Sequence, residues 1–422
     1  MLSWDETSNI TSQRWESSAD WLRQRAWVEI DVGAIAHNVR QIKHLLSPKC
    51  DLMAVVKADA YGHGAVTVSQ TVLSAGASWL GVATIPEGME LREAGIKAPI
   101  LVLGATYSPE QIRAMAKWEL MPTICTPQQA LVFSETLGED DASATAGAVR
   151  DADATPRGVH PLPVHVKLDT GMSRLGVSYS EADAFVQLIR SLPNLKIASI
   201  YSHLATADSQ DQTVMRQQQA RFEQAIGACN HHGSLPRLHF ANSAATFTDP
   251  SLHYDMVRVG LGIYGLYPAP HLRPVVDLKP VMQVKARITQ VKNISAGTGV
   301  SYGHQYIAKQ PMRLAVVGIG YADGVPRCLS NHMKVLIRGQ LLPQVGTITM
   351  DQMMVDVTAV PEVQPGEVVT LLGRQGDHQI GADDWAAICG TISWEILCSF
   401  KHRLPRLTVS RSLETRPEKA RY

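Results

Sequence analysis

Residues 52–84 read LMAVVKADAYGHGAVTVSQTVLSAGASWLGVAT and contain one full repeat of an alternating pattern. The run LMAVV at 52–56 is apolar throughout, which is typical of a strand buried on both faces in a parallel sheet. The stretch 65–76 has helical spacing and stops at Gly76. A second apolar run follows at 79–84. A strand, a helix and a strand in this order indicate a βαβ unit and therefore an α/β fold.

The same alternation extends in both directions from this stretch. Nine segments are candidate strands: 27–32, 52–57, 79–84, 99–104, 121–126, 164–170, 195–203, 237–243 and 256–260. Helical segments lie between them, for example 108–120, where Ser108 can cap the helix and Pro109 suits its first position. Eight repeats favour a closed (β/α)8 TIM-like barrel over an open sheet. Nine strands are one too many, so the first, 27–32, is the candidate for a place outside the barrel.

The pattern changes after residue 270. The segment 280–294 alternates apolar and polar residues, and later short apolar runs are joined by Gly and Pro turns with no helices between them. We therefore expect a β-rich C-terminal domain at 271–422, with a helix at 383–400 near its end. The fold class is then α/β plus β, a barrel followed by a mainly β domain.

Two further segments fall outside the regular pattern. Residues 1–25 are polar and mixed in charge, and we interpret them as an N-terminal extension of the 26–270 barrel domain. Residues 139–161 are rich in Ala, Asp, Thr and Gly and have no apolar periodicity, so they are expected to form a mobile surface insertion.

Composition excludes some classes of function. Lys plus Arg and Asp plus Glu are equal at 39 each, so no overall charge favours nucleic acid or an anionic membrane as a partner. No stretch reaches the roughly 18 apolar residues of a membrane span, and the N-terminus has no apolar signal region. The six cysteines show no CxxC spacing, which favours reduced thiols in a cytoplasmic protein. Function must therefore be sought in a local site.

Polar residues stand where the candidate strands end, at the edge where the active sites of β/α barrels lie. They are Lys57, Lys167, His203, Ser243 and Arg258. Each alone has a plain structural explanation, such as a snorkelling lysine, a Lys167–Asp169 ion pair or a satisfied core histidine. Five polar groups at matching strand ends would all point into one barrel mouth, and this favours a functional site.

The types of group at this mouth suggest a cofactor. A partly desolvated lysine amine can bond covalently to a carbonyl carbon. Ser243 lies in a strand-to-helix turn, and the backbone N–H groups of Gly260 and Leu261 are further donors for an anion. A reactive lysine beside a phosphate cradle indicates pyridoxal 5′-phosphate (PLP). No metal site is expected.

Specific motifs complete this interpretation. The chain resembles the alanine racemase family over about residues 26–407. The resemblance lies in AVVKADAYGHG (54–64), VKLDTGMSRLGV (166–177), SHLATAD (202–208), FANSAAT (240–246), DMVRVGLGIYG (255–265), VSYGHQY (300–306), VGIGYADGVPR (317–327) and VGTITMDQMMVDV (345–357). The resemblance implies a PLP-dependent isomerase that interconverts L- and D-alanine in a bacterial-type cytoplasm and supplies D-alanine for peptidoglycan.

The resemblance also implies a role for each matching residue. Lys57 would bind PLP and serve as one catalytic base, and Tyr302 would serve as the other. Tyr302 would come from the partner subunit, together with Met350 and Asp351 near the substrate carboxylate, which implies a head-to-tail homodimer with shared sites. Tyr61, Ser243, Gly260 and Leu261 would hold the phosphate, and His203 would lie beside the cofactor ring and hydrogen-bond to Arg258. Arg174 would support the cofactor and the substrate carboxylate, and a carboxylated Lys167 would brace Arg174.

Two of these positions carry a chemical argument of their own. A guanidinium stays charged and has no lone pair to offer, so Arg258 facing the pyridine nitrogen would leave that nitrogen unprotonated and favour racemisation over transamination. Trp394 departs from the family, which commonly has a tyrosine there whose hydroxyl reaches the phosphate. An indole offers only an N–H donor of different reach, so cofactor affinity is the property that this departure puts in question.

Three other functions compete with this one. An amino-acid decarboxylase of the same fold type would place a glutamate at the pyridine nitrogen and a cysteine opposite the lysine, where this chain has Arg258 and Tyr302. A non-catalytic PLP-binding protein would need only the barrel. A racemase for another small amino acid, such as serine, shares every feature above, and the sequence leaves this alternative open.

Overall fold

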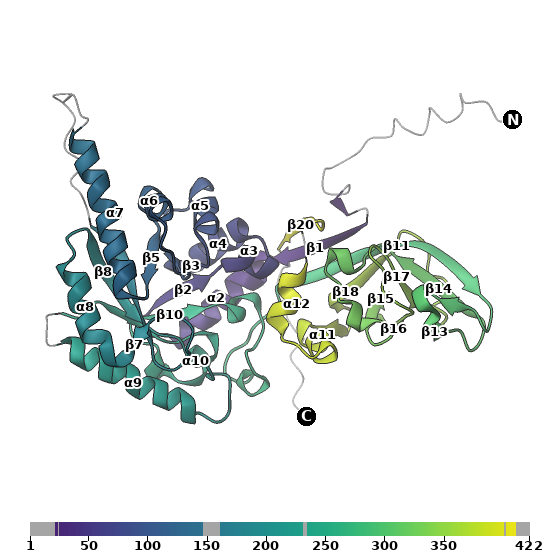
Figure 1. Ribbon diagram of the computed structural model, residues 1–422. Helices are drawn as coiled ribbons and strands as arrows, with labels where there is room; N and C mark the ends of the chain where they lie inside the picture. Colours follow the sequence, from purple (N-terminus) through teal and green to yellow (C-terminus); the bar gives the residue numbers. More distant parts are fainter. Residues whose placement is uncertain (1–21, 24, 147–160, 231–233, 401, 411–422) are drawn as a thin grey trace. The chain divides into compact units, whose positions relative to one another are not determined.

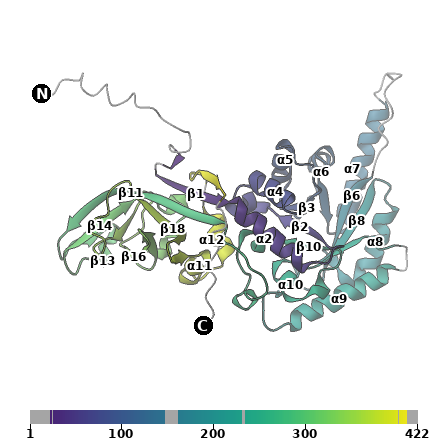
Figure 2. The ribbon, with the colours of Figure 1, turned by 180° about the vertical axis from the view of Figure 1, so that it is seen from behind.

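The computed structural model describes residues 22–23, 25–146, 161–230, 234–400 and 402–410 (Figure 1; Figure 2). Within these residues the chain divides into two compact units. One unit spans 32–281, and the other joins 22–31 to 282–410.

Eight parallel strands close the first unit into a barrel. In order around the ring they are β2 (Asp51–Val55), β3 (Trp79–Val82), β4 (Ile100–Val102), β5 (Met121–Ile124), β6 (Leu162–Asp169), β8 (Leu195–Tyr201), β9 (Arg237–His239) and β10 (Met256–Val259). Pairing of β5 with β6 and of β10 with β2 completes the ring. A two-residue strand, β7 (Val177–Ser178), pairs in parallel with the end of β6 and is not part of the ring. The expected TIM-like barrel is confirmed.

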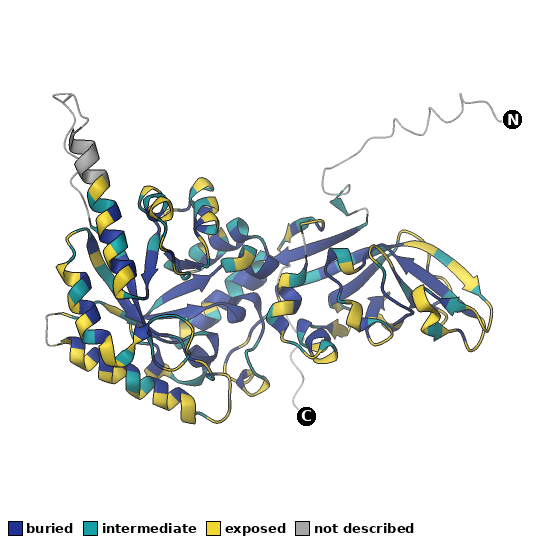
Figure 3. Cartoon of the chain, in the orientation of Figure 1, coloured by how far each residue is buried: buried dark blue, intermediate teal, exposed yellow. Residues whose placement is uncertain are grey.

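Helices surround the barrel strands. They are α2 (Val32–Leu45), α4 (Ala65–Ser74), α5 (Ile85–Glu93), α6 (Pro109–Lys117), α7 (Pro127–Ala146), α8 (Ala182–Ser191), α9 (Thr213–Cys229) and α10 (Ser243–Thr248). The short segment α3 (Lys57–Gly62), between β2 and α4, is left-handed at residues 58–61. In α8 the buried residues are Ala182, Phe185, Val186 and Ile189, the spacing of a helix with one apolar face. Figure 3 shows the result, buried strands inside and exposed residues on the outer faces of the helices.

The first candidate strand belongs to the second unit. This strand, β1 (Ala26–Asp31), pairs antiparallel with β11 (Met282–Ile294) and parallel with β20 (Arg406–Val409). Residues 271–281 belong with the barrel, where the Lys279 N–H donates to Asn38 Oδ1 at 2.7 Å. The observed division therefore differs from the expected 26–270 and 271–422 at both boundaries. Residues 26–31 lie in the later domain because β1 completes its sheet, and residues 271–281 lie with the barrel.

The second unit is mainly β, as expected. Its nine-stranded sheet has the order β19-β18-β15-β16-β17-β14-β11-β1-β20. The remaining strands are β14 (Met312–Val317), β15 (Lys334–Ile337), β16 (Gln340–Val345), β17 (Met353–Asp356), β18 (Val368–Gln375) and β19 (His378–Ile380), with the separate pair β12 (Gly299–Val300) and β13 (Tyr306–Ile307). The single helix expected at 383–400 is instead two, α11 (Ala382–Cys389) and α12 (Ser393–Ser399), because Gly390 ends α11 with a φ of 66°.

Two sequence expectations fall partly outside the described residues. The predicted insertion at 139–161 begins inside α7, which continues to Ala146, and residues 147–160 lie outside the described part. The predicted extension at 1–25 is described only at residues 22, 23 and 25. No helix in the described part of the chain combines the length and the hydropathy needed to cross a membrane.

Candidate active site

Lys57 follows β2 and starts a left-handed turn. The four residues 58–61 have φ between 52° and 55°, a conformation that costs an L-residue roughly 1–2 kcal/mol each. Hydrogen bonds to two side chains offset part of this cost. Glu87 Oε1 accepts the Ala58 N–H at 2.7 Å, and Asp59 Oδ1 accepts the first N–H of α4 at 2.8 Å. The turn leaves Lys57 half-buried at the end of its strand.

The turn also brings Tyr61 back against the loop after β10. Its ring is buried and lies 4.8 Å from the ring of Tyr264. A Cβ added at Gly260 would stand 2.6 Å from the Tyr61 hydroxyl oxygen, so only glycine allows this approach. The Gly260 N–H in turn donates to Ser243 Oγ at 3.0 Å. Tyr61, Ser243 and the Gly260 backbone therefore converge, and the hydroxyl groups of Tyr61 and Ser243 are donors that suit a phosphate.

Arg258 is buried on β10 and is surrounded by neutral acceptors. Its Nη1 donates to His239 Nδ1 at 3.0 Å, and its Nη2 reaches the Ser202 carbonyl at 2.8 Å and His203 Nδ1 at 3.2 Å. Burial lowers the pKa of Arg258 to about 10. Burial first, and then the charge of Arg258, hold the pKa values of both histidines well below 6.5. At neutral pH the guanidinium is therefore the charged member of this group.

A chain of buried polar groups continues from Arg258 into the barrel. Since Arg258 can only donate, His239 accepts at Nδ1 and carries its proton on Nε2. His239 Nε2 lies 2.7 Å from Ser199 Oγ, which lies 2.5 Å from His165 Nδ1. Each group donates to the next, so the chain fixes the tautomers of both imidazoles. Burial lowers the pKa of His165 to about 3, which keeps it neutral as well.

Lys167 is buried beside the same group. Its Nζ lies 4.4 Å from the centroid of the Tyr201 ring. Burial, followed by the charge of Arg258, lowers the pKa of Lys167 to about 7. The sequence suggests Asp169 as an ion-pair partner of Lys167. The Asp169 Oδ1 instead accepts hydrogen bonds from the N–H groups of residues 171–173 at 2.9–3.1 Å. Asp169 thereby orders the loop that carries the exposed Arg174.

The other predicted site residues lie in the second unit. Tyr302, which begins a short 3-10 turn after β12, is 74% exposed and Met350 is 53% exposed, high values for large apolar side chains. The Thr347 hydroxyl donates to the Tyr302 carbonyl at 2.8 Å, which ties Tyr302 to the loop that carries Met350 and Asp351. Trp394 lies half-buried near the start of α12. The structure thus gathers the predicted residues into two groups, one in each unit.

Sequence reasoning missed the buried polar residues below the barrel mouth. They are His165, Ser199, Tyr201 and His239. The signal that could have found them is the two-residue period of a strand. His165 and Lys167 are two residues apart on β6, and Ser199 and Tyr201 are two residues apart on β8. The two side chains of each pair therefore lie on the same face of the sheet. Among the described residues, no group of three or more His, Cys, Asp or Glu is arranged to hold a metal ion.

Comparison with known proteins gives a consistent result. Residues 30–268 match the family described as alanine racemase, N-terminal domain, and residues 281–408 match alanine racemase, C-terminal domain. An alanine racemase of Nostoc sp. strain PCC 7120 is 64% identical over 92% of this chain and 97% of its own length. One of Synechocystis sp. strain PCC 6803 is 59% identical over 92% of this chain and 100% of its own. The solved structure of alanine racemase from Clostridium difficile 630 aligns with a TM-score of 0.83 at 32% identity and covers 92% of this chain and 96% of that one.

Proposed function

The chain belongs to the alanine racemase family, and on this premise we propose that it interconverts L- and D-alanine with PLP as its cofactor. One observation carries the proposal beyond family membership. A half-buried lysine at a barrel strand end shares one unit with a cradle of Tyr61, Ser243 and Gly260 and with a buried arginine. Few small-molecule sites other than a PLP site need a reactive amine, a phosphate cradle and a fixed cation together.

The residues present fit this cofactor. Lys57 would bond to its aldehyde carbon, and Tyr61, Ser243 and the N–H groups of Gly260 and Leu261 would hold its phosphate. His203 would lie beside the ring. When bound, the cofactor withdraws electrons from the substrate Cα and so weakens its Cα–H bond. Removing and returning that proton is then the task of the protein's own side chains.

Racemisation needs a proton removed from one face of Cα and another supplied to the opposite face, so we assign two bases, Lys57 and Tyr302. Tyr302 and Met350 expose large apolar groups that a second copy of the chain would cover. As the family resemblance implies, each chain would lend its Tyr302 to the barrel of a second copy, which makes the proposed assembly a head-to-tail homodimer. D-alanine made in the cytoplasm would then serve peptidoglycan synthesis.

The surroundings of Arg258 support racemisation over the rival PLP reactions. Arg258 donates to imidazole nitrogens and backbone carbonyls, which are neutral, so its charge remains available to the pyridine nitrogen. A guanidinium has no proton to give up at neutral pH, which disfavours protonation of that nitrogen and hence transamination. A decarboxylase would use a carboxylate at this position.

Direct conversion assays test the proposal. The purified chain with PLP should convert L-alanine to a racemic mixture, followed by chiral chromatography, and should act more slowly on L-serine. A serine rate above the alanine rate would favour the alternative substrate. No conversion of either amino acid would overturn the proposed function.

Lys167 is expected to be N-carboxylated. Its amine has a pKa of about 7, so it is mostly neutral above pH 7 and can add carbon dioxide with loss of a proton. With ¹³C-bicarbonate at pH 8, ¹³C NMR should show a protein-bound carbamate carbon that fades as the pH falls below about 7. The Lys167→Met variant should lack this signal. Equal spectra for the two proteins would contradict the assignment.

Trp394 is expected to limit cofactor affinity. One hydrogen bond contributes roughly 1 kcal/mol, so Trp394→Tyr, which restores the hydroxyl common in the family, should tighten PLP binding about fivefold. Trp394→Phe, which has no donor, should weaken binding by a similar factor. Equilibrium dialysis of PLP against the cofactor-free protein measures both. Equal dissociation constants for all three proteins would show that this position does not contact the phosphate.

A further inference from the structure

We propose that Arg403 is a positioning residue for Asp351, which it orients and neutralises so that the site accepts the carboxylate group of the amino-acid substrate. The inference rests on the proposed function and on the place that the family resemblance implies for Asp351, near the alanine carboxylate. Neither the motifs of the chain nor the strand-end pattern singles out Arg403.

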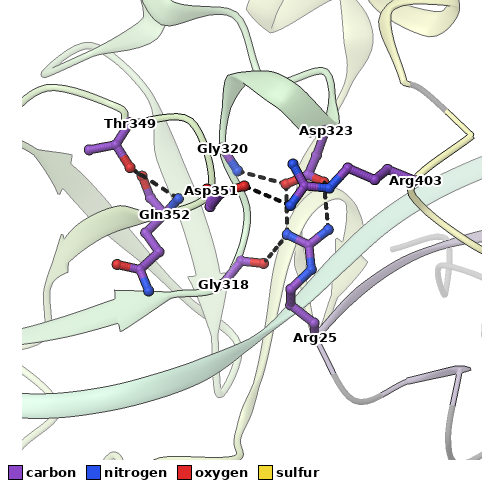
Figure 4. Close-up of polar contacts among 8 residues, drawn as sticks. All are labelled: Arg25, Gly318, Gly320, Asp323, Thr349, Asp351, Gln352 and Arg403. Atoms are coloured by element: carbon purple, nitrogen blue, oxygen red, sulfur yellow. Dashed lines mark hydrogen bonds and ion pairs between the residues drawn. The ribbon is translucent and has the colours of Figure 1, made fainter.

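Four charged side chains of the second unit form an alternating row (Figure 4). Arg25 donates to both oxygens of Asp323, at 2.5 and 2.8 Å. Arg403 Nε lies 3.5 Å from Asp323 Oδ1, and its Nη2 donates to Asp351 Oδ1 at 2.6 Å. The row thus alternates two cations and two anions from Arg25, just before β1, to Asp351. Arg403 is the member that contacts Asp351.

The inner end of this row is fixed. Asp323 has no exposed side-chain surface, and it also accepts the Gly320 N–H at 3.0 Å. Arg25 is held in addition by the Gly318 carbonyl at 3.1 Å, and the hydrogen bond with Asp323 raises its pKa above the ordinary value. Asp323 is therefore a rigid anchor from which Arg403 can hold its outer partner.

The loop that carries Asp351 is docked on the same anchor. The backbone N–H groups of Tyr321 and Ala322 donate to the carbonyls of Thr349 and Met350, each at 3.0 Å. A Cβ at Gly320 would stand 2.3 Å from the Thr349 carbonyl oxygen, so the two loops touch through their backbones. The backbone of the loop is thus already placed, and what Arg403 adds is the direction and charge balance of the Asp351 carboxylate.

The outer pair is better explained by function than by stability. In the single chain the side chains of Arg403 and Asp351 are 46% and 53% exposed, so their pairing contributes little to the folding of that chain. A carboxylate near the carboxylate of alanine would repel it, whereas the same carboxylate paired with a guanidinium is close to neutral. Arg403 therefore removes a repulsion that Asp351 would otherwise impose on substrate binding.

A single variant and a double variant test this role. Arg403→Gln should raise KM for alanine about tenfold and leave kcat within about twofold, because the unpaired Asp351 repels the substrate in the ground state as in the transition state. Asp351→Asn in the Arg403→Gln background should lower KM again, because the repelling charge is gone. The inhibition constant of propionate, a carboxylate without an amine, should follow KM in both variants.

Arg338→Gln is the matched control. Arg338 is 41% exposed and pairs with Glu367 at 2.8 Å in the same unit, so its loss removes a similar surface ion pair without touching Asp351. Its KM should equal that of the wild type. An unchanged KM in Arg403→Gln, or a double variant whose KM stays as high as in Arg403→Gln, would overturn the inference. An inactive wild type would instead overturn the proposed function.

Discussion

Replacing Lys57 with alanine is expected to abolish racemisation, with kcat lower by about 10⁴-fold or more, because the variant loses both the covalent attachment of PLP and one of the two bases. Lys97→Ala removes an exposed lysine of the same unit and should keep wild-type activity. Methylamine added to Lys57→Ala should restore part of the rate, because a free amine can replace a missing one. Activity is measured by chiral chromatography.

The attachment itself can be tested independently of activity. Borohydride treatment of the PLP-loaded wild type should leave the cofactor mass on the peptide that contains Lys57, and the Lys97→Ala variant should give the same peptide. Lys57→Ala should yield no such modified peptide. Cofactor mass found on another lysine, or a Lys57→Ala variant with more than a tenth of the wild-type rate, would contradict the assignment of Lys57.

Tyr302→Phe is expected to lower kcat in both directions by about 10²–10⁴-fold, the usual contribution of one general acid–base group. The side chain is 74% exposed, so the loss of one hydroxyl should leave the free energy of unfolding within about 0.5 kcal/mol of the wild type. Tyr306→Phe removes the same group from a neighbouring residue that packs against the domain core and should have little effect on kcat.

A second readout distinguishes a lost base from a general defect. If Lys57 still works on its own face of Cα, Tyr302→Phe should exchange the Cα hydrogen of one alanine enantiomer with deuterated water, without inversion, and leave the other enantiomer unlabelled. Proton NMR and chiral chromatography of the same samples measure exchange and inversion. Loss of exchange for both enantiomers, or unchanged racemisation, would argue against Tyr302 as the second base.

The parts of the fold that follow from local pattern could be predicted. Apolar runs separated by helices give the barrel, and the excess strand at 27–32 indicates a place outside it, which the pairing of β1 with β11 confirms. The split at Gly390 was missed because apolar residues continue on both sides of a glycine whose positive φ ends the helix. The domain boundary at residue 281 was missed because the irregular segment before β11 has neither a helical nor a strand period. Its sequence therefore does not assign it to either domain.

The strand pattern alone predicts only the part of the site that lies at strand ends. Lys57, Lys167 and Arg258 close apolar runs. The left-handed conformation of 58–61, by contrast, opposes the usual preference of L-residues and is supported by the hydrogen bond from the Ala58 N–H to Glu87. The row from Arg25 to Asp351 joins residues far apart in the sequence, and no local period records such a contact. Long-range ion pairs of this kind require the folded chain.

The most direct test of the central claim, that two bases act on opposite faces of Cα, is the fate of the Cα hydrogen during inversion. Ordinary L-alanine is incubated with the wild-type protein and PLP in deuterated water, and the first D-alanine formed is isolated and examined by proton NMR. Two bases predict that this D-alanine carries deuterium at Cα, because its hydrogen comes from a group that never held the original proton. D-alanine that retains the original hydrogen would show that one base serves both faces and would contradict the account.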